Sequence, residues 1–186
     1  DTSVYWHITS YTSPTDVQAL ASVSSSAITP TLYAGTWGDG VYHSIDLGAT
    51  WLETTAGITL PMSVKDGLAV NPVIPTVLFA GAYFGSFSGV GVYRSTNGGI
   101  SWTVSLQDVD IETLLVHPLT PTLVFAGTRE EGLYRSTNNG DSWQSSTLPA
   151  SQVQVLAAAP ITPGMLYAGA SNALYTSAND GISWTL

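Results

Sequence analysis

The chain has 186 residues, only 9% of them charged, and a formal net charge of −9 because 13 acidic residues stand against four basic ones. Four Lys and Arg residues cannot form the basic stripe that a phosphate backbone requires, so nucleic acid is excluded as an expected partner. No apolar run reaches the roughly 18 residues of a membrane-spanning helix, which excludes membrane insertion, and the lack of cysteine excludes disulfides and thiol chemistry.

The chain opens on a partial copy of a motif that is complete further along. Asp1 precedes Trp6 by the same five positions that separate Asp46 from Trp51. The first full repeat, residues 12–55, begins with an apolar segment at Val17–Val23 and continues with the segment Pro30–Gly35. Alternating β-branched and aromatic residues, punctuated by Gly, Pro and Asn, predict short strands in these segments and not helices.

The same order of segments returns over residues 62–106, 107–147 and 148–186. First strands are expected at Gly67–Val70, Thr113–Val116 and Val153–Ala158, and third strands at Gly91–Ser95, Gly132–Ser136 and Ala173–Ser177. A Leu/Val-Tyr/Phe-Ala-Gly segment provides the second strand of each repeat, and the fourth is expected to start at a Trp. A period of about 40–50 residues with four strands per unit is typical of propeller blades. The sequence therefore predicts an all-β chain, a β-propeller or part of one, with four antiparallel four-stranded blades in residues 1–186.

Each repeat ends in a box with the pattern Ser-x-(Asp/Asn)-x-Gly-x-(Thr/Ser)-Trp. Its recurring positions are Ser44, Asp46, Gly48 and Trp51, then Ser95, Asn97, Gly99 and Trp102, then Ser136, Asn138, Gly140 and Trp143, and finally Ser177, Asn179, Gly181 and Trp184. An Asp or Asn side chain accepts backbone N–H groups in a tight turn, and glycine supplies a positive φ there. Because Asn replaces Asp in three boxes, the position needs an acceptor and not a charge, which favours a folding role over a catalytic one.

These boxes resemble the Asp-box repeats, also called bacterial neuraminidase repeats. Tyr33-Ala-Gly-Thr-Trp-Gly-Asp-Gly-Val-Tyr42, followed by the first box, is most similar to xyloglucanase-type glycoside hydrolases and to uncharacterised bacterial Asp-box propellers. The resemblance implies a propeller with its boxes in the turn between third and fourth strands, away from the usual binding face. The arginine triad and Arg-Ile-Pro motif of sialidases do not occur here. Xyloglucanase-type enzymes use aspartates in two propellers across a cleft, and four blades cannot supply that whole arrangement.

Candidate functional residues are expected in the loops on the face opposite the boxes, which join strand two to strand three and strand four to the next strand one. The candidate ligand-binding residues are Trp37, Asp39, Tyr83, Phe84, Phe87, Arg129 and Glu130. Exposed aromatic rings beside carboxylates suit sugars, although the aromatic residues could instead pack the long loop at 82–89 against a neighbouring blade. Asp108 and Asp110 belong to an expected loop that joins strand four to the next strand one, and a solvated loop is the favoured interpretation of this pair. The alternatives are a cation site or an acid/base pair, since residues two apart on an extended segment lie on one face at about the separation that glycoside hydrolysis requires.

The sequence favours a non-catalytic binding or scaffold module that recognises a glycan or a protein through the loop face. Its acidic, Ser/Thr-rich composition favours a secreted or cell-surface bacterial protein, without a cofactor or a metal site. The alternative is a fragment of a glycoside hydrolase acting on xyloglucan or another β-glucan, with Asp39, Asp108 or Asp110 contributing to catalysis. Three arrangements remain open: part of a longer propeller, two copies that form one ring, or four blades that close alone.

Overall fold

The computed structural model describes residues 14–23, 30–65, 67–82 and 91–186, and in them every regular element is a β-strand. Four antiparallel sheets follow one another along the chain, and we call them blades 1 to 4. Blade 1 contains β1 (Val17–Val23), β2 (Thr31–Thr36), β3 (Val41–Ser44) and β4 (Leu52–Glu53). Blade 2 contains β5 (Leu68–Val70), β6 (Leu78–Gly81), β7 (Val92–Ser95) and β8 (Thr103–Leu106).

Blade 3 contains β9 (Ile111–Val116), β10 (Val124–Thr128), β11 (Leu133–Ser136) and β12 (Gln144–Ser145). Blade 4 contains β13 (Val153–Ala158), β14 (Leu166–Ala170) and β15 (Ala173–Ser177), and a bridge between Thr176 and Thr185 stands in place of its fourth strand. Strands follow one another within each sheet in chain order. The predicted all-β fold of antiparallel propeller blades is therefore confirmed.

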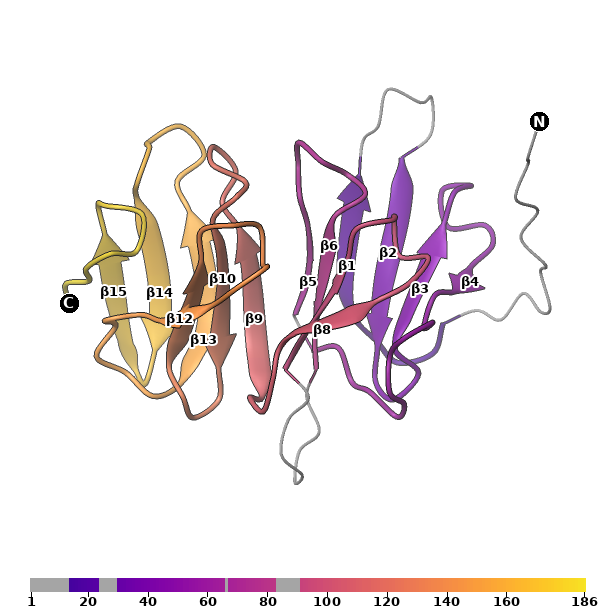
Figure 1. Cartoon of the computed structure of the whole chain (residues 1–186), viewed down its shortest axis with the longest axis horizontal. Coiled ribbons are helices and arrows are strands. Elements are labelled where there is room, and N and C mark those ends of the chain that lie inside the picture. The colour runs from indigo at the N-terminus through magenta and orange to yellow at the C-terminus, as the bar shows by residue number, and fades with distance from the viewer. Residues whose placement is uncertain (1–13, 24–29, 66, 83–90) are drawn as a thin grey trace.

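The blades are arranged side by side around their first strands. β1 lies against β5, β5 against β9, and β9 against β13. Figure 1 shows β4 and β15 at the two far ends of the molecule, with β5 and β9 between them. Blades 1 and 4 thus extend in opposite directions from the first strands, as blades do in one half of a ring.

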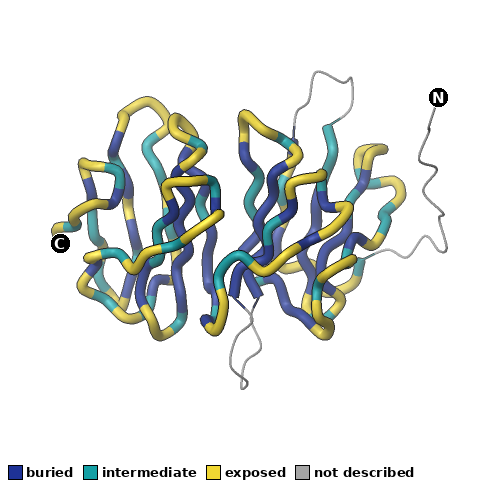
Figure 2. The backbone as a smooth tube through the Cα atoms, in the orientation of Figure 1, coloured by how far each residue is buried: buried dark blue, intermediate teal, exposed yellow. Residues whose placement is uncertain are grey.

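The apolar core lies between the blades and not within a single sheet. One cluster joins Tyr33 and Val41 of blade 1 to Leu78 and Trp102 of blade 2. Corresponding clusters join blade 2 to blade 3 and blade 3 to blade 4. Figure 2 shows the buried segments running along the strands while the connecting turns are exposed. This arrangement follows from the period of two residues, because alternate residues of each strand face the preceding and the following blade.

The predicted strand positions differ from the observed ones at particular places. β9 starts at Ile111, two residues before the expected Thr113, and the fourth strands β4, β8 and β12 begin one residue after the box Trp. The residue that follows the box Trp is the first to pair with the third strand: Leu52 pairs with His43, Thr103 with Arg94 and Gln144 with Arg135.

The boxes form one turn of constant geometry between the third and fourth strands. In all four, the Ser Oγ accepts the Gly N–H at 2.9 Å, and the Asp or Asn Oδ1 accepts the N–H four residues later at 2.8–3.0 Å. The backbone N–H inside the turn, at Gly98, Asn139 and Asp180, bonds to the turn between the first two strands of the same blade. The boxes therefore lie at one end of the strands, and the candidate loops lie at the other.

Candidate functional site

The loop face is the end of the blades that carries the connections between second and third strands and the residues that precede each first strand. The Trp37 N–H donates to the Asp16 carbonyl at 3.0 Å, and the Arg129 N–H donates to the Asp110 carbonyl at the same distance. Trp37 and Arg129 are therefore equivalent residues of blades 1 and 3. Each loop is tied to the residue just before the first strand of its own blade.

The loop that carries Trp37 and Asp39 is held by hydrogen bonds at both of its ends. The Thr36 N–H and Oγ1 donate to the Gly40 carbonyl at 2.9 and 3.0 Å, and the Met62 N–H donates to the Gly38 carbonyl at 3.1 Å. Thr128 makes the same two bonds to Gly132 in blade 3. Because the backbone is fixed in this way, a side chain on the loop can meet a ligand with little loss of loop entropy.

The candidate side chains on these loops are open to solvent to different degrees. Trp37 is 51% exposed, which is unusual for an indole in a chain whose other described Trp residues are at least half covered. Asp39 is exposed and accepts the Thr15 hydroxyl at 3.3 Å. Glu130 is exposed, and Arg129 is half-buried. Trp37 and Asp39 thus form an aromatic and acidic pair on one fixed loop, a combination that suits a sugar ring.

Asp108 and Asp110 lie in the loop before β9, where the favoured loop interpretation places them. Asp108 has a left-handed φ of 61° and β9 starts only at Ile111, so neither aspartate belongs to the regular strand. Asp108 is exposed, whereas Asp110 is half-buried and its Oδ1 is buried without a hydrogen-bond partner in the described part of the chain. A buried carboxylate oxygen without a partner is uncommon, because its lost hydration is normally replaced by a hydrogen bond.

The structure adds an ion pair that the sequence analysis did not single out. Lys65 Nζ lies 2.9 Å from Glu112 Oε2, and the Glu112 side chain is only 9% exposed. Lys65 precedes blade 2 and Glu112 belongs to β9 of blade 3, so the pair joins two blades at the loop face. Two signals in the sequence indicate this acidic region: Asp110 and Glu112 are two residues apart, and Asp16, Asp66 and Asp110 each precede a first strand.

Some of the expected site lies outside the described residues, namely Tyr83, Phe84 and Phe87. Among the described residues, no group of three or more His, Asp or Glu side chains could hold a metal ion. The same described residues contain no helix that is long and apolar enough to cross a membrane.

Comparisons with known proteins were made by sequence and by structure. No family model and no curated protein matches the chain. An ancestral GH74 enzyme superposes with a TM-score of 0.77 at 21% identity, over 92% of this chain and 24% of that one. The GH74 xyloglucanase of Xanthomonas campestris gives 0.72 at 20%, over 95% and 31%, and the GH74 enzyme of Niastella koreensis gives 0.68 at 16%, over 83% and 27%.

The chain thus spans about a quarter to a third of the length of these enzymes. At such identities the likeness establishes the β-propeller fold.

Proposed function

We propose that this chain is part of an extracellular bacterial Asp-box propeller of the xyloglucanase type and that its loop face binds a β-glucan chain such as xyloglucan. The observation that supports this proposal most is the exposed Trp37 ring on the same loop as Asp39, a loop fixed at both ends. A pyranose ring presents an apolar face to an indole and hydroxyl groups to a carboxylate, so this pair offers both contacts that a sugar needs.

Asp110 is the carboxylate best suited to take part in hydrolysis. Its Oδ1 has no hydrogen-bond partner among the described residues; a substrate hydroxyl would donate to the ionised carboxylate, and the protonated carboxyl would donate to a glycosidic oxygen. Asp108 is exposed, and Glu112 is already paired with Lys65. A glycoside hydrolase needs two carboxyl groups on opposite sides of the scissile bond. We therefore assign Asp110 to one wall of a cleft whose second carboxyl group lies outside the described blades.

Calorimetric titration of the chain with xyloglucan and cellulose oligosaccharides tests this proposal. We expect binding in the wild type and a loss of about five- to thirtyfold in affinity in Trp37→Ala, because stacking on one aromatic ring is worth about 1–2 kcal/mol. Ile161→Ala is the matched control, because Ile161 is 87% exposed at the opposite, box-bearing end. Unchanged affinity in Trp37→Ala, or no binding to any β-glucan oligosaccharide, would contradict the proposal.

Measuring the reducing ends released from xyloglucan distinguishes a chain that takes part in hydrolysis from one that only binds the glycan. If the chain hydrolyses xyloglucan even slowly, Asp110→Asn should abolish the release while the affinity stays within about twofold. The contrary outcome is glycan binding without any hydrolysis, even with the remainder of a GH74-type propeller added, and with the same affinity in Asp110→Asn. That outcome would identify the chain as a non-catalytic binding module.

A further inference from the structure

Each contact between consecutive blades places a residue of the third strand beside the box of the following blade. Arg94 of β7 and Arg135 of β11 hold equivalent positions, because each directly precedes the first Ser of its own box. Asp141 and Ile182 are also equivalent, since each lies five residues after the first Ser of its box. The contact between blades 2 and 3 therefore pairs an arginine position with an aspartate, and the contact between blades 3 and 4 pairs an arginine position with an isoleucine.

The two arginines differ in how their charge is neutralised. Arg94 Nη1 lies 2.6 Å from Asp141 Oδ1. The half-buried Arg135 donates from Nε to the Asp180 carbonyl at 2.8 Å, but no carboxylate of the described residues forms an ion pair with its guanidinium. The Asp180 carboxylate faces another side chain, with Oδ1 3.7 Å from His117 Nε2. The Nη donors of Arg135 therefore have no acceptor among the described residues, although partial burial costs a charged group hydration that a partner normally replaces.

An open hollow of about 180 Å³ lies beside Arg135, between the fourth strand of blade 3 and the box of blade 4. Its other lining residues are mostly polar, and they are Gln144, Ser145, Ser146, Thr147, Gly181 and Ile182. Ser146 Oγ accepts the Trp184 indole N–H at 3.1 Å, and Thr147 Oγ1 donates to the Ile182 carbonyl at 2.9 Å. The contact between the two blades thus fixes the wall of a hollow that combines one guanidinium with amide and hydroxyl groups.

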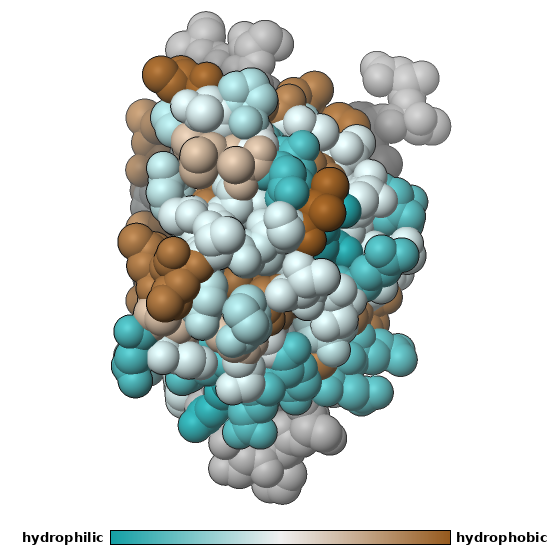
Figure 3. Space-filling model, turned by 90° about the vertical axis from the view of Figure 1, so that its left-hand side faces the viewer, coloured by the Kyte–Doolittle hydropathy of each residue, from teal (hydrophilic) through white to brown (hydrophobic). Residues whose placement is uncertain are grey.

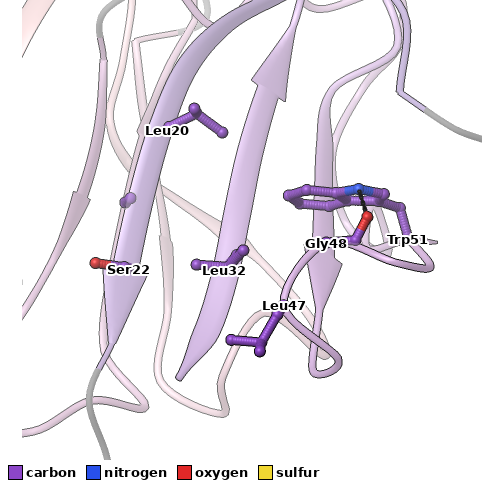
Figure 4. Close-up of a pocket in the computed structure, with 7 residues that line it drawn as sticks. Leu20, Ser22, Leu32, Leu47, Gly48 and Trp51 are labelled. Carbon is purple, nitrogen blue, oxygen red and sulfur yellow. Dashed lines mark hydrogen bonds between the residues drawn. The ribbon is translucent and has the colours of Figure 1, made fainter. Parts of the chain in front are cut away.

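Another hollow, of about 300 Å³, has a different chemistry. It lies on blade 1 and is lined by apolar side chains that include Leu20, Leu32, Leu47 and Trp51 (Figure 4). In the larger propeller proposed above, a neighbouring blade packs on this face, and leucines beside an indole suit such a contact. The hollow at Arg135, by contrast, lies between two described blades and offers a charged donor.

The charge around Arg135 also differs from the charge of the loop face. Figure 3 views the molecule from the blade 4 end and shows hydrophilic side chains gathered toward the bottom, where the loops lie. Asp39, Asp110 and Glu130 belong to that loop face, and the whole chain has a net charge of −9. Arg135 directly precedes a box and so lies toward the other end of the strands. A negatively charged ligand is therefore repelled by the loop face but meets a cation at the hollow.

We propose that the hollow between blades 3 and 4 is a second ligand site, and that it binds a uronic acid with the sugar carboxylate on the Arg135 guanidinium. The contact has a precedent in the chain, because the Asp141 carboxylate binds Arg94 at the equivalent place. A guanidinium can donate two parallel N–H bonds to one carboxylate. The exposed Gln144 and Ser145 side chains supply donors and acceptors for sugar hydroxyl groups, which favours an acidic sugar over an acidic peptide.

The test is an NMR titration of the ¹⁵N-labelled chain with sodium glucuronate at low ionic strength, with glucose as the uncharged comparison. The Arg135 Nε–H and the Trp184 indole N–H report on the hollow, because Trp184 bonds to Ser146 in its wall. We expect glucuronate to shift both signals saturably and glucose to leave them in place. Arg135→Gln should weaken glucuronate binding at least about tenfold, since hydrogen bonds to a charged group are the strong ones. Arg94→Gln is the matched control and should leave the affinity unchanged.

Ile182→Asp tests the same contact without removing the arginine. It places a carboxylate where Asp141 stands in the preceding contact, and the 62% exposure of Ile182 means that the fold tolerates the change. The new carboxylate should occupy Arg135 and weaken glucuronate binding as strongly as Arg135→Gln does. The proposal would be overturned by no saturable shift in the wild type, by equal shifts with glucose, or by unchanged affinity in either variant. N-acetylglutamate that binds as tightly as glucuronate would also overturn it and would assign the hollow to an acidic peptide.

Discussion

Asn71 in blade 2 and His117 in blade 3 close the same turn with different side chains. Asn71 Oδ1 accepts the N–H groups of Val73 and Ile74 at 2.9 and 2.8 Å, and His117 Nδ1 accepts those of Leu119 and Thr120 at 3.2 and 3.0 Å. Both side chains then reach the box of the following blade. Asn71 Nδ2 donates to Asn139 Oδ1 at 3.0 Å, and His117 Nε2 lies 3.7 Å from Asp180 Oδ1.

This equivalence predicts that His117→Asn is tolerated and that His117→Ala is not. The alanine leaves two amide N–H groups without their acceptor beside a fully buried position, which costs about 1–3 kcal/mol. The asparagine restores the acceptor, so the free energy of unfolding should fall by less than half as much. Urea unfolding followed by tryptophan fluorescence measures both. An equal loss of stability in the two variants would show that the imidazole acts by filling space and not by accepting the N–H groups of the turn.

A box indole that bonds to the preceding blade should contribute more to the free energy of unfolding than one that bonds within its own box. Trp102 is 3% exposed and bonds to Thr54 of blade 1, whereas Trp51 is half-buried and bonds within its own box. Trp102→Ala should therefore cost about 3–5 kcal/mol, and Trp51→Ala less than half of that. Thermal unfolding of the two variants at low concentration checks the order, and a larger loss in Trp51→Ala would contradict it.

Much of the fold can be predicted from the sequence because the conformation of each turn and the packing between blades require the same residues. The box needs a small residue with positive φ, an acceptor and a large apolar side chain at fixed offsets, and these residues recur in register with the Ala-Gly strands. The bounds of β1, β13 and β15 are those expected, since each is a short apolar run ended by turn residues.

The site was harder to predict because it depends on contacts between segments that are distant in the chain. The loop at Asp108 and Asp110 was expected, but the left-handed φ of Asp108 was not, because nothing in an isolated Asp-Val-Asp sequence requires that conformation. The ion pair of Lys65 with Glu112 spans 47 residues and forms only when blades 2 and 3 are packed. The matching loop positions of Trp37 and Arg129, by contrast, could be predicted, because each residue directly follows an Ala-Gly-Thr segment.

Glycines of positive φ allow backbone strain to be separated from steric conflict. Gly140 has φ of 80°, and a β-carbon there would collide with the Phe79 ring, whereas Gly38 has φ of 97° and open space around it. Gly38→Ala should cost only the left-handed penalty of about 1–2 kcal/mol, and Gly140→Ala more, because the ring of blade 2 must also move. Denaturant unfolding of both variants measures the difference. Equal losses of stability would mean that the Phe79 ring can move away from residue 140 at little cost in free energy.

Asp46 provides a pH test of the box. The Thr50 hydroxyl and backbone N–H, together with the Ser44 hydroxyl, bond to its carboxylate and lower the pKa of Asp46 from 3.8 to about 2. Because the folded pKa lies below the unfolded one, the carboxylate stabilises the fold fully above about pH 4 and loses this contribution as the pH falls toward 2. The three boxes with Asn do not titrate.

Asp46→Asn should therefore fold like the wild type at pH 7, since Asn97 makes the corresponding turn and donates from Nδ2 to Ser101 at 2.9 Å. The difference in the free energy of unfolding between wild type and variant should stay constant from pH 7 to about 5 and shift against the wild type between about pH 4 and 2. Other carboxylates titrate equally in both proteins and cancel in this difference. Carboxyl carbon NMR locates the titration of Asp46 directly, and a midpoint near 3.8 or a flat difference would contradict the stabilisation of the ionised form by the box.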